Sequence, residues 1–281
     1  MNKPFAATEP QIKSYDPIWS QVRREAEAIS AAEPALGGFI YATVLSHARL
    51  EDAVCHRLAR RLQHAALDPG LLHKTFNEVL TEHPWLGEAF RADLMATVKR
   101  DPASSRLIEP LLYFKGFHAL ETYRIAHELW KAGRKDFALY LQSLTSRFLQ
   151  VDIHPAAVIG KGIMFDHATG IVIGETAVVG DNCSMLHGVT LGGTGSEKGD
   201  RHPKIGRGVM MGAGAKILGN IKVGDCARVA AGSVVLKDVP SRRTVAGVPA
   251  REIGFAGCEE PALAMDQMFV GDDDANHGQI P

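Results

Sequence analysis

The amino-acid sequence predicts a two-part α+β protein: an N-terminal all-helical domain (residues 1–150), then a left-handed parallel β-helix of hexapeptide repeats (residues 151–255). Two periodicities carry this prediction. Apolar residues recur every three or four positions up to about residue 149, which is the spacing of an amphipathic α-helix. From Ile153 onward they recur every six positions, which matches neither a helix nor a simple alternating strand. Residues 256–281 are expected to form a flexible C-terminal tail.

Three Asp-Pro pairs mark expected helix starts in the N-terminal half: Asp16-Pro17, Asp68-Pro69 and Asp101-Pro102. Asp at the N-cap accepts hydrogen bonds from backbone N–H groups that lack a partner in the first turn, and Pro at the first helical position loses nothing by lacking its own. Pro84 and Pro110 mark further helix starts or kinks. We expect six to eight helices here, packed into one compact domain.

The six-residue period runs through thirteen apolar or small positions, with one break of ten extra residues. They are Ile153, Ile159, Phe165, Ile171, Ala177, Cys183, Val189, then Ile205, Met211, Ile217, Val223, Val229 and Val235. The period predicts short parallel strands joined by tight turns, with about 18 residues in each triangular coil and coils stacked about 4.8 Å apart. A glycine-rich sandwich with accidental spacing is the alternative. The break predicts that residues 195–204 loop out of one face.

Counting 18 residues per coil places Asp152, His167 and His187 near one corner on successive coils. A carboxylate can orient an imidazole and stabilise its protonated form, so this corner predicts general-base chemistry. The alternative is a solvated corner histidine. Asp166 should point away from His167 if that stretch is extended. Cys183 is expected in the core, and the sequence shows no exposed Ser-His or Cys-His pair, so direct transfer is favoured over a covalent intermediate.

The stretch "VTLGGTGSEKGDRHPKIG" contains the break in the repeat and ends near Arg201 and His202. A long excursion from a solenoid is either a tolerated surface loop or part of a site. An Arg beside a His in such a loop suits the binding of a substrate carboxylate. Its glycines form neither a GxGxxG nor a Walker A pattern, so the sequence gives no support to a nucleotide-binding fold.

The overall composition argues against nucleic-acid and membrane partners. The formal net charge is -1, with 46% hydrophobic and 22% charged residues, so the whole molecule has no strong field to attract a polyanion. No stretch approaches 18 uninterrupted apolar residues. The four cysteines, Cys55, Cys183, Cys226 and Cys258, form no CxxC pair, which suits a reducing compartment. We therefore expect a cytoplasmic protein.

Several stretches closely resemble bacterial serine acetyltransferases, of the hexapeptide-repeat acyltransferase superfamily. They are "VDIHPAAVIGKGIMFDHATGIVIGETAVVG", "VTLGGTG…GDRHPKIG", "MGAGAKILGNI" and "AAGSVVLKDVP…AGVPAR". The likeness covers the whole predicted β-helix, and a helical half precedes it in that family too. It implies acetyl transfer from acetyl-CoA, as co-substrate, to the hydroxyl of L-serine, giving O-acetyl-L-serine for cysteine biosynthesis. It also implies inhibition by L-cysteine, and neither a metal nor a permanently bound cofactor.

The resemblance assigns roles to individual residues. His167 matches the family's general base, and Asp152 matches its carboxylate partner. The residues that match its serine-binding positions are Asp101, Asp166, His167, Arg201 and His202, with Arg201 facing the substrate carboxylate. The residues that match its acetyl-CoA groove, between neighbouring β-helices, are Gly193, Thr194, Ala213, Gly214 and Ala231.

The resemblance also implies an assembly. The family forms homotrimers through its β-helices, often paired into hexamers through the N-terminal domains, so that its sites use residues from two chains. Its members commonly end in an isoleucine that docks into O-acetylserine sulfhydrylase. This chain ends in Ile280-Pro281, one residue too long, and the departure argues against that complex.

Three other functions remain as alternatives. A hexapeptide acetyltransferase acting on another hydroxyl acceptor, such as homoserine or a sugar, would not need the helical half or the "GDRHP" stretch. A metal-dependent β-helix hydratase needs three imidazoles around zinc, yet no two histidines after Pro155 are closer than 15 residues. A non-catalytic scaffold would not need His167.

Overall fold

The computed structural model describes residues 16–64, 68–195 and 198–267. Within them, eight α-helices precede the first strand, which confirms the expected number. The helices are α1 (Pro17–Ala32), α2 (Gly37–Ile40), α3 (Leu50–Leu62), α4 (Pro69–Glu82), α5 (Leu86–Arg100), α6 (Ile108–Tyr113), α7 (Lys115–Lys131) and α8 (Lys135–Leu149). A 3-10 turn precedes α2 and a π-helical turn follows it.

Two of the three expected Asp-Pro helix starts are confirmed. Asp16 accepts the N–H of Trp19 at the start of α1, and Asp68 accepts the N–H of Gly70 at the start of α4. The third expectation is wrong, because Asp101 follows the last residue of α5 and no helix begins until α6. Its carboxylate accepts the N–H of Ala103 at 2.8 Å, so it closes a turn on itself, as Asp does readily.

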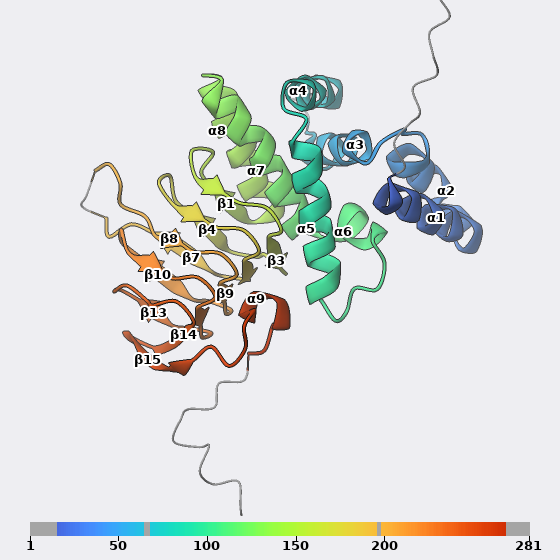
Figure 1. Cartoon of the computed structure of the whole chain (residues 1–281). Helices are drawn as coiled ribbons and strands as arrows, with labels where there is room; N and C mark the ends of the chain where they lie inside the picture. Colours follow the sequence, from blue (N-terminus) through green and yellow to red (C-terminus); the bar gives the residue numbers. More distant parts are fainter. Residues whose placement is uncertain (1–15, 65–67, 196–197, 268–281) are drawn as a thin grey trace, which may run out of the picture.

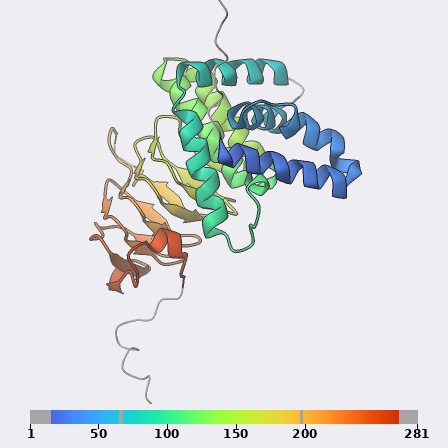
Figure 2. The same cartoon turned by 45° about the vertical axis from the view of Figure 1, so that its right-hand side comes forward.

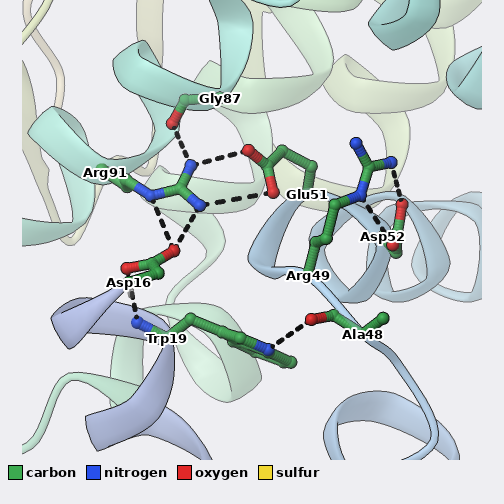
Figure 3. Close-up of polar contacts among 8 residues, drawn as sticks. All are labelled: Asp16, Trp19, Ala48, Arg49, Glu51, Asp52, Gly87 and Arg91. Carbon is green, nitrogen blue, oxygen red and sulfur yellow. Dashed lines mark hydrogen bonds and ion pairs between the residues drawn. The ribbon is translucent and has the colours of Figure 1, made fainter. Parts of the chain in front are cut away.

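An arginine network holds the first helices together (Figure 3). Arg91 of α5 lies between Glu51 of α3, at 2.7 Å, and Asp16 at the N-cap of α1, at 2.5 Å. Partial burial opposes ionisation of Asp16, but the hydrogen bonds from Arg91 and from the Trp19 N–H hold its pKa below the usual value. The indole of Trp19 donates to the Ala48 carbonyl at 3.0 Å, which fixes α1 against the loop before α3.

The second half is a parallel β-helix, as the sequence predicts. Its strands are β1 (Val151–Ile153), β2 (Val158–Ile159), β3 (Met164–Asp166), β4 (Ile171–Ile173), β5 (Val178–Val179), β6 (Ser184–Leu186), β7 (Thr190–Gly192), β8 (Lys204–Ile205), β9 (Met210–Met211), β10 (Lys216–Leu218), β11 (Lys222–Val223), β12 (Arg228–Val229) and β13 (Val234–Val235). They form three sheets, one for each side of a triangular prism: β1-β4-β7-β10-β13, β2-β5-β8-β11 and β3-β6-β9-β12. A final hairpin of β14 (Arg243–Gly247) and β15 (Ala250–Phe255) extends the third sheet.

The strand register corrects the predicted phase of the repeat. Ile153 pairs with Ile173, and Phe165 pairs with Met185, so the first coil contains 20 residues and not 18. The next step along the first sheet, from Ile173 to Leu191, is 18. Two extra residues therefore lie between Asp166 and Ile171. The inward positions after them run through 173, 179, 185 and 191, two residues later than the sequence pattern indicates.

The helical half packs directly on the β-helix, so that both contribute to one hydrophobic core. In Figures 1 and 2 the helices gather on one side of the prism, and α5 and α7 lie next to β3. A buried ion pair fastens the two halves. Arg124 of α7 binds Asp93 of α5 at 2.6 Å and also donates to the Gly160 carbonyl, while Asp93 accepts the N–H of Ile163.

The chain folds back onto the β-helix after β15. The short helix α9 (Pro261–Ala264) places the buried Ala262 against Leu186 and Met210, and its carbonyl accepts the hydroxyl of Ser184 at 2.8 Å. In the described part of the predicted tail, residues 256–267, the buried residues are Ala256, Pro261 and Ala262, and Ile280-Pro281 lies outside the described residues. None of the described helices is both long enough and apolar enough to span a bilayer.

Candidate functional site

The two extra residues of the first coil form a bulge at His167 and Ala168. Both have left-handed backbone angles, with φ of 53° and 57°, which L-residues other than glycine rarely adopt. Ala168 is fully buried under Gly116 of α7, where a Cβ atom would lie 3.2 Å from the Ala168 Cβ. Lys115 donates a hydrogen bond to Thr169. The start of α7 therefore holds the bulge in place and leaves His167 projecting outward.

The side chain of His167 is 78% exposed, and Asp166 Oδ1 lies 3.8 Å from its Nε2. The expectation that Asp166 points away from His167 is wrong, because the left-handed turn at His167 interrupts the extended backbone on which that expectation rested. The imidazole of His187 lies edge-on to that of His167, with ring centroids 6.2 Å apart. One corner of the prism therefore combines two imidazoles and a carboxylate.

Below this corner runs a column of glycines, Gly170, Gly188, Gly214 and Gly232, all with φ between 69° and 77°. The N–H of each donates to a carbonyl one coil above, such as that of His187 for Gly214. A Cβ on Gly188 would lie 3.4 Å from the Gly214 Cα, so the glycines let the backbones of successive coils stack closely at this corner. Of the residues expected to line the acetyl-CoA groove, Ala213, Gly214 and Ala231 stand in or next to this column.

Asp152 has a different environment. It is the middle residue of β1, directly beside Val172 of β4, and its Oδ1 accepts the side-chain amide of Gln142 of α8 at 2.6 Å. No hydrogen bond or ion pair joins it to His167 within this chain, where both residues are described. The same is true of Asp101, whose carboxylate stays in its own turn. Of the three residues that were predicted to converge, Asp152, His167 and His187, only the two histidines contact each other directly.

A second cluster forms where the long loop returns to the prism. Thr176, just after β4, accepts the backbone N–H groups of Arg201 and His202 on its hydroxyl oxygen at 3.0 and 3.1 Å. Arg201 Nη2 donates to Glu175 at 2.9 Å. His202 lies flat over Gly174, where any Cβ would fall 2.1 Å from the ring. The adjacent residues Arg201 and His202 are therefore held at this corner by Glu175 and Thr176, which the prediction missed.

The hydrogen bonds of His202 define its tautomer. Its Nδ1 accepts the N–H of Thr176 at 3.2 Å and lies 2.8 Å from the Thr176 hydroxyl, so a neutral ring carries its proton on Nε2. Burial lowers the pKa of His202 below its usual value, and the adjacent Arg201 lowers it further, against an opposing effect from Glu175. At neutral pH this residue is a neutral hydrogen-bond donor.

His154 belongs to the same cluster, and the sequence prediction missed it as well. Its Nδ1 accepts the N–H of Ala156 at 3.1 Å, and its ring stands edge-on to Trp130 at 5.1 Å. Burial lowers its pKa, which the charges of Glu175 and Asp152 partly oppose. The only signal in the sequence was its place two residues after Asp152, directly after β1, which ends at the same corner as Gly174.

The two clusters lie at opposite edges of one face of the prism. Gly170 marks the first edge and Gly174 the second, and four residues of extended chain span about 13 Å. Gly193 and Thr194, also expected to bind acetyl-CoA, lie at the second edge, where a Cβ on Gly193 would be 3.4 Å from Arg201 and Thr194 contacts Gly219. Apart from Asp101, which follows α5, and Asp152, which lies within β1, the predicted site residues of one chain thus flank the strands β4, β7 and β10.

The described residues contain no group of three or more His, Cys, Asp or Glu side chains arranged to hold a metal ion. The exposed chemistry of this face is therefore that of imidazoles, one arginine, carboxylates and backbone amides. Cys183, which the sequence places in the core, is fully buried, and burial raises the pKa of its thiol to about 12. It is a packing residue and not a nucleophile.

Comparisons with known proteins agree with this arrangement. Residues 18–122 match the family model "Serine acetyltransferase, N-terminal", and residues 202–237 match "Bacterial transferase hexapeptide (six repeats)". The serine acetyltransferase of Salmonella typhimurium is 50% identical over 90% of this chain and 93% of its own length.

Solved structures give the same result. The serine acetyltransferase of Brucella abortus strain S19 in complex with coenzyme A has a TM-score of 0.86 and 59% identity, covering 87% of this chain and 98% of its own. A serine acetyltransferase in complex with cysteine has a TM-score of 0.88 and 49% identity, with coverage of 90% and 98%. That of Neisseria gonorrhoeae in complex with serine has a TM-score of 0.82 and 49% identity, with coverage of 86% and 99%. The chain therefore belongs to the serine acetyltransferase family, whose members are acyltransferases.

Proposed function

We propose that the protein transfers acetyl from acetyl-CoA to the hydroxyl of L-serine, giving O-acetyl-L-serine and coenzyme A, as a step toward cysteine. The observation that carries this proposal is the pair of clusters at the edges of one prism face, in a chain whose relatives were solved with coenzyme A and with serine. One cluster offers a base at His167, and the other offers donors for a carboxylate at Arg201 and His202.

The chemistry needs a base because an alcohol is a weak nucleophile at neutral pH. In the proposed step, His167 takes the hydroxyl proton as the serine oxygen attacks the thioester carbonyl carbon, and later returns a proton to the sulfur as the C–S bond breaks. Asp166, at 3.8 Å, stabilises the protonated ring, and Asp152 is the proposed carboxylate partner. The N–H groups of the glycine column already donate to carbonyls, so we propose that another backbone N–H beside this corner binds the tetrahedral oxyanion.

We propose that Arg201 binds the substrate carboxylate and that His202 donates through Nε2–H, with Asp101 contributing to the same site. The Glu175–Arg201 ion pair supports this role, because it holds the guanidinium at the edge of the face while 29% of the arginine side chain stays exposed. We assign the acetyl-CoA groove to Gly193, Thr194, Ala213, Gly214 and Ala231. Their positions along the two edges of that face support an acetyl-CoA molecule lying over it.

Since the two clusters are about 13 Å apart within one chain, we propose that each site is completed by a neighbouring chain in a homotrimer. Trimers paired into hexamers through residues 1–150 are part of this proposal, with the catalytic β-helix at residues 151–255. L-cysteine, which differs from serine by one atom and is bound in a relative, is the proposed inhibitor at the same site. The four free cysteines support a cytoplasmic location.

An assay of thiol release from acetyl-CoA tests the proposal. The purified protein is given L-serine, L-homoserine or a galactoside acceptor, with a reaction lacking acceptor as the control. We expect release that depends on L-serine, with O-acetyl-L-serine as the product identified by mass spectrometry. Faster release with homoserine or the sugar would assign the enzyme to another acceptor, and no release with any acceptor would contradict acetyl transfer.

A further inference from the structure

A cavity of about 660 Å³ lies between α5, the segment around α9 and a different corner of the prism. That corner precedes β3, β6 and β9, whereas His167 follows β3, so the whole width of the third sheet separates the cavity from the His167 cluster. Five basic residues line it: Lys99, Arg100, Lys161, Arg207 and Arg242. Nothing in the proposed reaction uses them.

Arg100 is the most informative of these residues. It is 7% exposed, and its Nη1 donates to the Cys183 carbonyl at 3.0 Å and to the Ser184 hydroxyl at 3.1 Å. Its Nε has no hydrogen-bond partner among the described residues, and no described carboxylate lies within ion-pair distance of the guanidinium. A buried cation without a counter-charge is costly, which points to an anion supplied from outside the fold.

The acidic residues of the cavity do not neutralise its basic wall. Asp181 Oδ1 accepts the backbone N–H of Lys161 at 2.8 Å, and Arg207 pairs outward with Asp225 at 3.3 Å. Glu260 is near enough to act on Arg100 electrostatically, yet it forms no ion pair with it. Among the described residues Lys99 and Lys161 have no ion-pair partner either. Glu259 also lines the cavity, so five basic residues face three acidic ones, Asp181, Glu259 and Glu260, and a formal excess of positive charge remains.

We propose that this cavity binds a small oxyanion with two or more negative charges, of the phosphate or polycarboxylate type. Arg100 is its inner donor, since a guanidinium offers paired N–H groups that match such oxygens. Lys99 and Lys161, both exposed at the rim, supply the outer charge. The open, polar shape suits a hydrated ion more than an apolar ligand.

The test uses the full chain with inorganic phosphate, pyrophosphate and citrate, each against sodium chloride at equal ionic strength. Binding to the native state alone raises the melting temperature, and at ten times the Kd we expect an increase of about 2–4 °C, which grows further with the logarithm of the anion concentration. Isothermal titration calorimetry should give one site per chain. Binding of citrate but not of phosphate would show that the cavity takes a polycarboxylate, and binding of phosphate but not of citrate would show that it takes a phosphate.

The variants separate this site from general anion effects. The double substitution Lys99→Ala with Lys161→Ala removes two rim charges, and we expect it to raise the Kd at least tenfold. Lys222→Ala with Lys237→Ala removes two exposed lysines away from the cavity and should leave the Kd unchanged. Arg100→Lys should also weaken binding, with its anion-free melting temperature as the check on folding. Equal affinities in both double variants, or no saturable binding of any of the three anions, would overturn the proposal.

Discussion

His167 and Ala168 show how a reactive side chain is displayed by an otherwise regular repeat. Each holds a left-handed backbone conformation that costs an L-residue roughly 1–2 kcal/mol. Burial of Ala168 beneath α7 offsets part of that cost and keeps the neighbouring imidazole outside. The sequence indicated His167 as a candidate base, but no pattern in it marked this backbone, because neither residue is a glycine.

The proposed base is tested by His167→Ala and His167→Asn. Both remove the proton acceptor, and Asn also tolerates the left-handed conformation, so it separates loss of chemistry from backbone strain. We expect kcat to fall about 10²–10⁴-fold in both variants, since this is the usual contribution of such proton transfer. Circular dichroism and the oligomer mass should stay unchanged. Full activity in His167→Asn would remove the base assignment.

Thr176 is a positioning residue in our account, since it holds the backbone of Arg201 and His202 and fixes the His202 tautomer. Thr176→Val removes the hydroxyl with little change of shape. Losing these hydrogen bonds should raise the KM for serine about tenfold and change kcat less, because they act on binding. Thr176→Ser, which keeps the hydroxyl, is the matched control and should restore the KM. An equal rise of the KM in Thr176→Val and Thr176→Ser would mean that Thr176 acts through its packing and not through its hydroxyl.

Among the elements, the coils explain why the repeat predicts the β-helix correctly but places its inward residues two positions too early after Asp166. After the bulge, two positions that lie two residues apart are buried in each hexad, as in Ile171 and Ile173 or Cys183 and Met185. A six-residue count fits either set, so the two inserted residues could not be located. The helix starts show a similar limit. Asp101 has the same local sequence as Asp16 and Asp68, but the chain after it turns toward α6.

The contact between α7 and β3 sets the place of the bulge, and Gly116 permits it. A Cβ at Gly116 would lie 2.3 Å from the Phe165 carbonyl oxygen, which the backbone cannot accept without moving. Gly116→Ala should therefore lower the free energy of unfolding by about 1–3 kcal/mol and reduce activity, through displacement of the bulge. Chemical denaturation measures the first effect. Gly38→Ala, with no atom within 4 Å of its Cβ, is the control and should be neutral or slightly stabilising.

In the molecule as a whole, one face of the prism carries the His167 cluster and the Arg201–His202 cluster at opposite edges, and the two clusters do not contact each other within one chain. Sequence spacing alone placed residues along the coil but could not show the second cluster, because Arg201 and His202 return to Thr176 across 25 residues or more. The family resemblance supplied their proposed roles. Their contacts with Glu175 and Thr176 depend on the tertiary path of the loop, which the sequence pattern does not predict.

Mixed assemblies test whether a site takes its clusters from two chains. His167→Ala and Arg201→Ala chains, each inactive alone, are co-expressed with different tags and purified for both. If the base comes from one chain and the arginine from its neighbour, random mixing leaves about a third of the sites intact in trimers that carry both tags, and about a quarter in hexamers, with a matching share of wild-type activity. Co-expression of two copies of His167→Ala is the control. No recovery in the mixed assembly would place both residues in a site within one chain.

The bulge at His167 and the long loop before β8, which both depart from the six-residue repeat, also bear on how such a chain can evolve. The bulge adds two residues, and the long loop adds eight between the inward residues Leu191 and Ile205. Both lie at prism corners, and the strands beyond them pair in full register with those before. Reactive groups can therefore be added, lengthened or exchanged at the corners while the stacked walls stay the same. The constant spacing of the strands thus lets the corners of the prism acquire new side chains while the pairing of its walls is kept.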